Sequence, residues 1–234
     1  MIKRLLYGMF PRRCPICDKC INSNIDICSK CEGKLEFLKE PKCKKCGKPI
    51  DAEEKEYCMD CEKSNHLYET GIGAYVYSNE VKQSIYKFKY HNRRDFSEFY
   101  GRSIATHFQK EIEYWNADVI IPIPIHRKKL VSRGYNQAEL FARELSKWLQ
   151  IPMDSHLLVR VLNTKPQKEL GNNDRSKNLK NAFKLTENVV KYNKVILVDD
   201  IYTTGSTIDA CSEVLLLGGA KKIYFISLGI GTGI

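Results

Sequence analysis

Long apolar runs are scarce in the 234-residue sequence, and this scarcity excludes several classes of protein. No segment approaches the roughly 18–20 consecutive apolar residues that a membrane-spanning helix requires. Residues 1–10 lack both the apolar core and the small-residue cleavage site of a secretory signal. The sequence also lacks a Gly-x-x-x-x-Gly-Lys-Ser/Thr segment, which argues against a P-loop enzyme. We therefore expect a cytoplasmic protein without membrane insertion.

Cysteine is scarce in the larger part of the chain and abundant in the smaller part. Of the 10 cysteines, Cys211 stands alone after Cys61, and the others lie between Cys14 and Cys61. The composition is otherwise that of a soluble globular protein, with a formal net charge of +10. This asymmetry predicts two domains, a small one over residues 1–66 and a larger one over residues 67–234.

Four Cys-x-x-Cys pairs dominate residues 1–66. They are Cys14/Cys17, Cys28/Cys31, Cys43/Cys46 and Cys58/Cys61. A two-residue spacer lets a tight turn direct two sulfurs at one ion, so four pairs supply two four-cysteine sites. In a reducing compartment this pattern favours zinc over disulfides, and a full thiolate shell makes each zinc structural. The spacing allows sequential or interleaved pairing; sequential pairing closes shorter loops and is the one we expect, while Cys20 is either a free thiol or an alternative ligand.

Residues 67–234 alternate between strand and helix patterns. The sequence predicts strands over residues 71–77, 118–123, 157–162, 195–198 and 223–228. It predicts helices over residues 80–90, 136–149 and 208–217, and a longer helix that ends near Trp115 and has Ser97 as its N-cap. Residues 163–180 are polar and contain Pro, Gly and Asn, which indicates a long loop. Strands that alternate with helices predict an α/β fold, a parallel sheet with flanking helices.

Segment 195–207 carries the clearest ligand-binding pattern. An apolar strand delivers Asp199 and Asp200 to its carboxyl end, where open α/β sheets bind their ligands. A short loop then opens a helix, and its residues are Thr203, Thr204, Gly205, Ser206 and Thr207. Loop amides, hydroxyls and the positive end of a helix suit a phosphate, while carboxylates accept from ribose hydroxyls or reach Mg²⁺ through water. The pattern fits a ligand that holds both a ribose and a 5′-phosphate.

This loop resembles the phosphoribosyl pyrophosphate (PRPP) loop of type I phosphoribosyltransferases, and two further segments narrow the resemblance. Residues 121–137, from Ile121-Pro-Ile-Pro-Ile to Arg133-Gly-Tyr-Asn-Gln137, resemble the signature of the ComF family of competence proteins (ComFC/GntX-like). Residues 160–183 are similar to that family's second block, and the upstream cysteine pairs also fit. The resemblance covers almost the whole chain. It implies a double zinc ribbon followed by a type I phosphoribosyltransferase-like domain.

The resemblance also implies how PRPP is held. Arg127, Arg133 and their basic neighbours would hold the pyrophosphate together with Mg²⁺, and residues 165–180 would form a flap that adds Lys165, Gln167 and Arg175. Residues 119–138 contain no acidic side chain, which agrees with an anion pocket. No catalytic residue follows from the sequence. Thr203 stands where purine-salvage relatives carry an Asp, which argues against hypoxanthine or guanine as the acceptor.

A basic stretch at residues 82–94 supplies a second candidate site. It mixes aromatic residues with the cations Lys82, Lys87, Lys89, Arg93 and Arg94, and it contains no carboxylate. Cations neutralise phosphates and exposed aromatic rings stack bases, so the stretch suits single-stranded DNA. The alternative is an amphipathic helix that buries Ile85 and Phe88 and leaves its lysines in solvent.

Two functions stay open at this point. The resemblance to ComF proteins implies a PRPP-binding protein of natural transformation, which supports the import or handling of single-stranded DNA in the cytoplasm. Its partners would include the DNA-uptake machinery and a helicase. The alternative is an active PRPP-dependent phosphoribosyltransferase of nucleotide metabolism with an unidentified acceptor.

Overall fold

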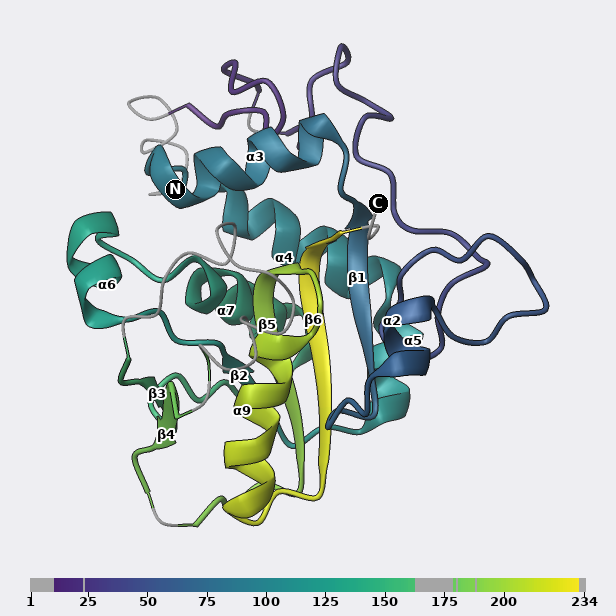
Figure 1. Cartoon of the computed structure of the whole chain (residues 1–234). Coiled ribbons are helices and arrows are strands. Elements are labelled where there is room, and N and C mark those ends of the chain that lie inside the picture. The colour runs from purple at the N-terminus through teal and green to yellow at the C-terminus, as the bar shows by residue number, and fades with distance from the viewer. Residues whose placement is uncertain (1–10, 23, 163–178, 180, 188, 232–234) are drawn as a thin grey trace.

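The computed structural model describes residues 11–22, 24–162, 179, 181–187 and 189–231, and Figure 1 shows their arrangement. A four-stranded sheet lies at the centre of the described chain, in the order β1–β6–β5–β2. The strands are β1 (Thr70–Val76), β2 (Val119–Pro122), β5 (Lys194–Tyr202) and β6 (Lys222–Ile230). Every pairing is parallel, and Val198 of β5 is level with Pro122 of β2 and Ile226 of β6. The expected parallel sheet is confirmed.

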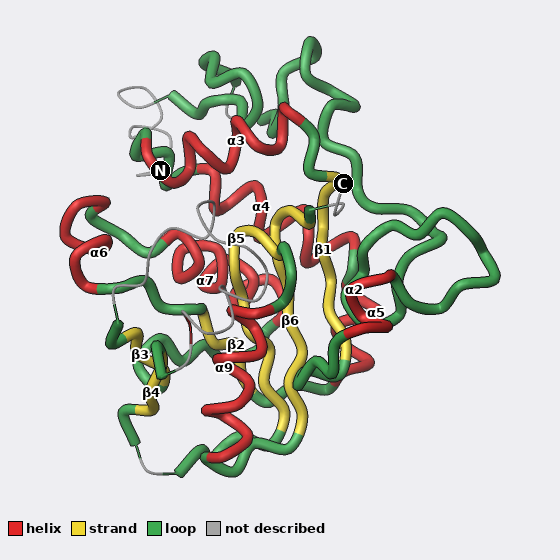
Figure 2. Tube along the Cα trace, in the orientation of Figure 1, coloured by secondary structure: helices red, strands yellow, loops and turns green. Residues whose placement is uncertain are grey.

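The two sides of the sheet face two separate hydrophobic cores. Val195 and Leu197 of β5 face one core and Ile196 and Val198 face the other, because successive side chains of a strand alternate. The α3/α4 face is covered by α3 (Asn79–Tyr90), α4 (Phe96–His107), α5 (Gln109–Trp115) and α7 (Gln137–Leu149). The α9 face is covered by α9 (Ser206–Leu217) and the short strands β3 (Leu158–Arg160) and β4 (Phe183–Leu185). In Figure 2, α9 crosses in front of the sheet, and within the described residues no helix has the length and apolarity to cross a membrane.

Two expectations about secondary structure are wrong, and a third is confirmed only in part. The long helix breaks at Phe108 into α4 and α5. Ser97 lies inside α4, where its hydroxyl donates to the Arg94 carbonyl at 2.7 Å, and Asp95 takes the cap position. The strand expected near residue 160 forms β3, but β3 pairs antiparallel with β4 outside the central sheet. Met153 already lies beside β2 through a parallel bridge to Ile120, so β3 has no place there.

A short helix, α6 (Arg127–Arg133), follows β2 where the sequence predicted only a basic segment. The ring of His126 accepts a hydrogen bond from the Lys128 amide at 3.2 Å and so caps the start of α6. Gly134 ends the helix with a φ of +79°, a conformation that favours glycine. The helix therefore projects a row of cations beyond the carboxyl end of β2.

The cysteine-rich segment is joined to the sheet through β1. The Leu38 amide donates to the Ala74 carbonyl at 3.0 Å, and the Val76 amide donates to the Glu36 carbonyl at 3.2 Å. Figure 1 shows the first cysteine loops above α3 and the following ones beside α2 (Met59–Lys63) and β1. The two halves of this segment thus contact different parts of the α/β core.

Candidate functional site

The paired cysteines form two compact groups in the described chain. Cys14, Cys17, Cys28 and Cys31 make the first ribbon, and Cys43, Cys46, Cys58 and Cys61 make the second, with all sulfurs of a group within 4.8 Å of one another. Sulfur–sulfur distances are 3.7 Å for Cys17–Cys28 and 3.6 Å for Cys46–Cys58. A tetrahedron with zinc–sulfur bonds of 2.3 Å has edges of about 3.8 Å, so both groups fit structural zinc. Pairing is sequential, and Cys20 is exposed and outside both groups.

Asp200 lies on the α3/α4 face of β5 and is only 5% exposed. Its Oδ1 is 2.8 Å from Nζ of Lys89 in α3, and its Oδ2 accepts from the side-chain amide of Gln137 in α7. Burial opposes the charged form of Lys89, but the attraction of Asp200 outweighs it and raises the lysine pKa. Both carboxylate oxygens of Asp200 therefore contact residues of the protein itself.

Asp199 points to the opposite face, because neighbouring residues of a strand alternate. Its Oδ1 accepts a hydrogen bond from the Asp200 amide at 2.8 Å. Burial, and then the charge of Asp200, raise the pKa of Asp199 to about 7. The attraction of Lys89 and Arg160 opposes this rise. Asp199 is thus the carboxylate of the pair that remains for a ligand, and its charge changes near neutral pH.

The loop after β5 forms a narrow hollow together with Asp199. The hollow is lined in part by Asp199, Thr203, Gly205, Ser206 and Thr207, and the Thr204 hydroxyl braces the loop at 2.9 Å from the Ser206 hydroxyl. Gly205 has a φ of +79° and caps the first turn of the 12-residue helix α9. Amides at the start of a helix and nearby hydroxyls are donors for an anion. The arrangement suits a phosphate group.

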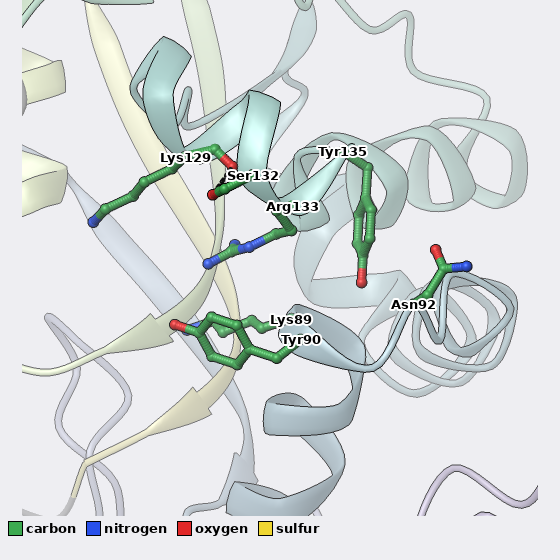
Figure 3. Close-up of a pocket in the computed structure, with 7 residues that line it drawn as sticks. All are labelled: Lys89, Tyr90, Asn92, Lys129, Ser132, Arg133 and Tyr135. Carbon is green, nitrogen blue, oxygen red and sulfur yellow. Dashed lines mark hydrogen bonds between the residues drawn. The ribbon is translucent and has the colours of Figure 1, made fainter.

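A second hollow, the cationic pocket, opens beside Lys89. It has a volume of about 250 Å³ and is lined by Lys89, Tyr90, Asn92, Lys129, Ser132, Arg133 and Tyr135. Figure 3 shows Arg133 over Tyr90, with Lys129 extending from the same helix α6. Burial, and then the charges of Arg160, Arg133 and Lys89, lower the pKa of Lys129. A cluster of mutually repelling cations suits a multiply charged anion.

Only part of the expected pyrophosphate set meets in this pocket. Arg133 lines it, whereas Arg127 is exposed at the start of α6 and is not among its described lining residues. Lys165, Gln167 and Arg175 lie outside the described residues. The roles of these four residues stay predictions.

The structure separates the basic residues of segment 82–94. Four of the five cations contact other parts of the protein. Lys87 donates to the Ile16 carbonyl at 3.0 Å, Arg93 pairs with Asp18 at 2.6 Å, and Lys89 pairs with Asp200. Arg94 stacks over Tyr135 at 4.7 Å, and Lys82 is exposed. Helix α3 does bury Ile85 and Phe88, so it has the amphipathic character of the alternative interpretation.

His66 is a residue of the site that no local sequence pattern marks. Its side chain is 2% exposed, and its Nδ1 lies 2.8 Å from Oδ2 of Asp209 in the first turn of α9. A carboxylate only accepts, so Nδ1 carries the proton. The ring also packs under Gly205, where an added Cβ would come within 2.8 Å of its Cε1. His66 therefore supports the loop of residues 203–207, which we call the phosphate-type loop.

Several known proteins are similar to this chain over most of its length. Competence protein F of Haemophilus influenzae is 32% identical over 84% of this chain and 87% of its own. DNA utilization protein YhgH of Escherichia coli (strain K12) is 28% identical with the same coverage. Competence protein ComFC of Bacillus subtilis (strain 168) is 26% identical over 82% of this chain and 79% of its own.

Two further comparisons match a shorter part of the chain or show a weaker similarity. Residues 5–62 match the family described as a double zinc ribbon domain. A solved purine phosphoribosyltransferase from Pyrococcus horikoshii shares 18% identity and a TM-score of 0.33, covering 61% of this chain and 85% of its own. Because competence protein F is 32% identical over 84% of this chain, the chain belongs to the ComF family of competence proteins.

Proposed function

We propose that this protein binds PRPP with Mg²⁺, and that it supports the handling of imported single-stranded DNA in the cytoplasm during natural transformation. The PRPP part rests on one observation. Asp199 lines a single hollow at the carboxyl edge of the sheet together with the loop residues Thr203, Gly205, Ser206 and Thr207. The names of the relatives, two competence proteins and a DNA utilization protein, support the DNA part.

Each part of PRPP has a place with matching chemistry. The 5′-phosphate takes the amides and hydroxyls at the start of α9, and Asp199 accepts from the ribose hydroxyls. The pyrophosphate, with Mg²⁺, lies toward the cationic pocket, where Arg133 and Lys129 offset its charge. Asp200 acts indirectly, because it holds Lys89 at the edge of that pocket.

Thermal melting tests this assignment. Saturating PRPP with Mg²⁺ should stabilise the wild-type protein by about 2.7 kcal/mol at a hundredfold excess over Kd. Asp199→Asn should remove most of this stabilisation. Glu213→Gln changes an exposed carboxylate elsewhere on α9 and should leave it intact. A wild-type protein whose melting temperature does not respond to PRPP would refute the PRPP assignment.

A second experiment separates the two halves of the ligand. Arg133→Gln should weaken the response to PRPP and to pyrophosphate, because both place charge in the cationic pocket. The same variant should leave the response to ribose 5-phosphate unchanged, because that ligand has no pyrophosphate. If Arg133→Gln weakened the response to all three ligands equally, the assignment of Arg133 to the pyrophosphate would be wrong.

Transferase activity is the second candidate function. The ring of Tyr90 is 60% exposed at the cationic pocket and offers a flat surface to a planar acceptor. Pyrophosphate release from PRPP in the presence of single nucleobases measures such activity. Release that requires both a base and Asp199 would establish an enzyme, whereas PRPP binding without release would limit the protein to the binding role.

A further inference from the structure

The solvent side of α3 carries an aromatic cluster, formed by Tyr86, Tyr90 and the adjoining His91. Tyr86 is 55% exposed and Tyr90 is 60% exposed. The ring of Tyr86 lies 5.0 Å from that of Tyr90 and 5.3 Å from that of His91, measured between centroids. Rings held together in water offer stacking surfaces to other flat rings.

A shallow groove of about 350 Å³ runs along this cluster. Its described lining residues are Asn79, Lys82, Gln83, Tyr86, Lys87 and His91, and none of them is acidic. The groove therefore combines stacking rings with positive charge. This combination is the one that binds single-stranded nucleic acids without regard to sequence.

Tyr90 connects this groove to the cationic pocket. Its ring contacts Tyr86 on the groove side and lies 4.9 Å from the guanidinium of Arg133 on the pocket side. Figure 3 shows Arg133 lying over Tyr90 among the residues that line the pocket. The described lining of the cationic pocket, like that of the groove, contains no Asp or Glu. One basic and aromatic stripe thus runs from Lys82 on α3 to Lys129 on α6.

We infer that this stripe is the path of single-stranded DNA and that one DNA phosphate occupies the cationic pocket, so that DNA and the pyrophosphate of PRPP exclude each other. The inference rests on the proposed function and adds the relation between its two ligands. Bases stack on Tyr86 and Tyr90, and the adjacent phosphate lies between Arg133 and Lys129. A pocket of about 250 Å³ leaves two phosphate groups at close range, where their repulsion is large.

Fluorescence anisotropy of a labelled oligothymidylate tests the exclusion on the full chain. Pyrophosphate with Mg²⁺ should raise the apparent Kd of the oligonucleotide in proportion to its concentration, and PRPP should do the same. Ribose 5-phosphate, which lacks the pyrophosphate, should not. Sodium chloride at equal ionic strength is the control, because salt alone weakens phosphate contacts.

Three variants assign the residues. Tyr86→Ala should weaken oligonucleotide binding roughly 5- to 150-fold, the equivalent of about 1–3 kcal/mol for one stacked base, and should leave pyrophosphate binding unchanged. Arg133→Gln should weaken both ligands. Tyr114→Ala removes a tyrosine that is 89% exposed on α5, away from the stripe, and should change neither.

Each contrary result has a distinct meaning. If saturating pyrophosphate leaves the oligonucleotide Kd unchanged, a ternary complex forms and the inference is overturned while the proposed function stands. If the wild-type protein does not bind the oligonucleotide, both the inference and the DNA part of the proposed function fail. If it binds the oligonucleotide but neither pyrophosphate nor PRPP, the inference and the PRPP part fail together.

Discussion

The two zinc ribbons share one chemistry but support different parts of the molecule. Each consists of two Cys-x-x-Cys pairs, separated by 10 residues in the first ribbon and by 11 in the second. The first ribbon is attached to the α3/α4 face, whereas the second is built into the core beneath the phosphate-type loop. A repeated motif therefore does not carry a repeated role in this protein.

Polar contacts, together with the partly buried Ile27 and Leu35, attach the first ribbon to the α3/α4 face. The buried hydroxyl of Ser84 donates to the Pro15 carbonyl, and Arg102 of α4 pairs with Asp26. The ribbon's own buried cluster is small and consists of Cys14, Ile16 and Cys31. The first ribbon is thus a module placed next to the basic and aromatic stripe.

Apolar packing builds the second ribbon into the α9 face. Cys43 and Cys46 belong to the same buried cluster as Tyr68 and Tyr202. The hydroxyls of Tyr68 and Tyr202 lie 2.6 Å apart, and Nζ of Lys48 lies 5.8 Å from the centre of the Tyr202 ring. Tyr202 is the residue directly before Thr203, so the second ribbon supports the base of the phosphate-type loop.

Removal of one zinc at a time should give the largest effect and tests the comparison most directly. Cys17→Ser in the first ribbon and Cys46→Ser in the second should each lower the zinc content by one ion per chain. Each should unfold its own ribbon, because a structural zinc contributes about 10–16 kcal/mol of apparent binding energy. Only Cys46→Ser should also abolish the melting response to PRPP. An equal loss of that response in both variants would remove the proposed division between the ribbons.

The pH dependence of stability should separate the two carboxylates of β5. Asp199 has a folded pKa of about 7 against an ordinary value of 3.8, so the unfolded chain releases this proton first as the pH rises. The contribution of Asp199 to the free energy of unfolding therefore falls as the pH rises from about 4 to about 7, and it is constant at higher pH. Asp199→Asn should lack the fall and exceed the wild type by on the order of 1–3 kcal/mol at pH 8.

Asp200→Asn is the matched control for this pH experiment. It leaves Lys89 without its ion-pair partner, so it should destabilise the protein near neutral pH. Urea unfolding from pH 4 to pH 8 measures both variants. A stability curve for Asp199→Asn that runs parallel to that of the wild type would contradict the raised pKa.

Loss of His66 should give the next largest effect and tests the link from the second ribbon segment to α9. His66→Ala removes a buried hydrogen bond to Asp209 and should cost about 1–3 kcal/mol in unfolding free energy. PRPP affinity should fall while the zinc content stays unchanged. His66→Asn, which keeps a donor near the same place, should restore part of the affinity, and the exposed His156→Ala should behave as wild type. Wild-type PRPP affinity in His66→Ala would show that the loop needs no support from this side.

Removal of a single hydrogen bond between a ribbon and the α/β core should have the smallest effect on stability. Ser84→Ala leaves the Pro15 carbonyl and the Tyr100 hydroxyl without a buried partner and should cost about 1–2 kcal/mol. On the second ribbon, Thr70→Val removes an exposed hydrogen bond of 2.7 Å to the Lys44 carbonyl and should cost about 0.5 kcal/mol. Neither should alter PRPP binding. Urea unfolding measures both losses. If Thr70→Val lost more unfolding free energy than Ser84→Ala, the second ribbon would depend more on its polar contact than the first, contrary to the comparison above.

The sequence predicted the features that depend on residues close together in the chain. The cysteine groups and the loop from Thr203 to Thr207 each arise from short segments, and the alternation of strands with helices gave the parallel sheet. The opposite directions of Asp199 and Asp200 are equally local, because a strand alternates its side chains. The expectation of one shared ligand nevertheless treated the two carboxylates as a unit.

Contacts between distant residues account for what the sequence did not predict. The pairing of Lys89 with Asp200 and of His66 with Asp209 joins segments that no short pattern relates. Helix α6 has no buried residue, so no apolar periodicity marked it as a helix. The aromatic content of α3 was visible as composition and the burial of Phe88 was one of the two interpretations, but only the fold shows that the rings of Tyr86 and Tyr90 face water side by side.

The pairing of residues 36–38 with β1 has a consequence for how the protein behaves at high concentration. An outer strand presents unpaired amides and carbonyls, which another molecule can extend into a fibre. The segment between the ribbons fills these positions along β1, as Met153 does beside β2. Chelation of the metal should loosen that cover and leave unpaired amides and carbonyls along β1, so we expect the metal-free protein to aggregate where the zinc-loaded protein does not.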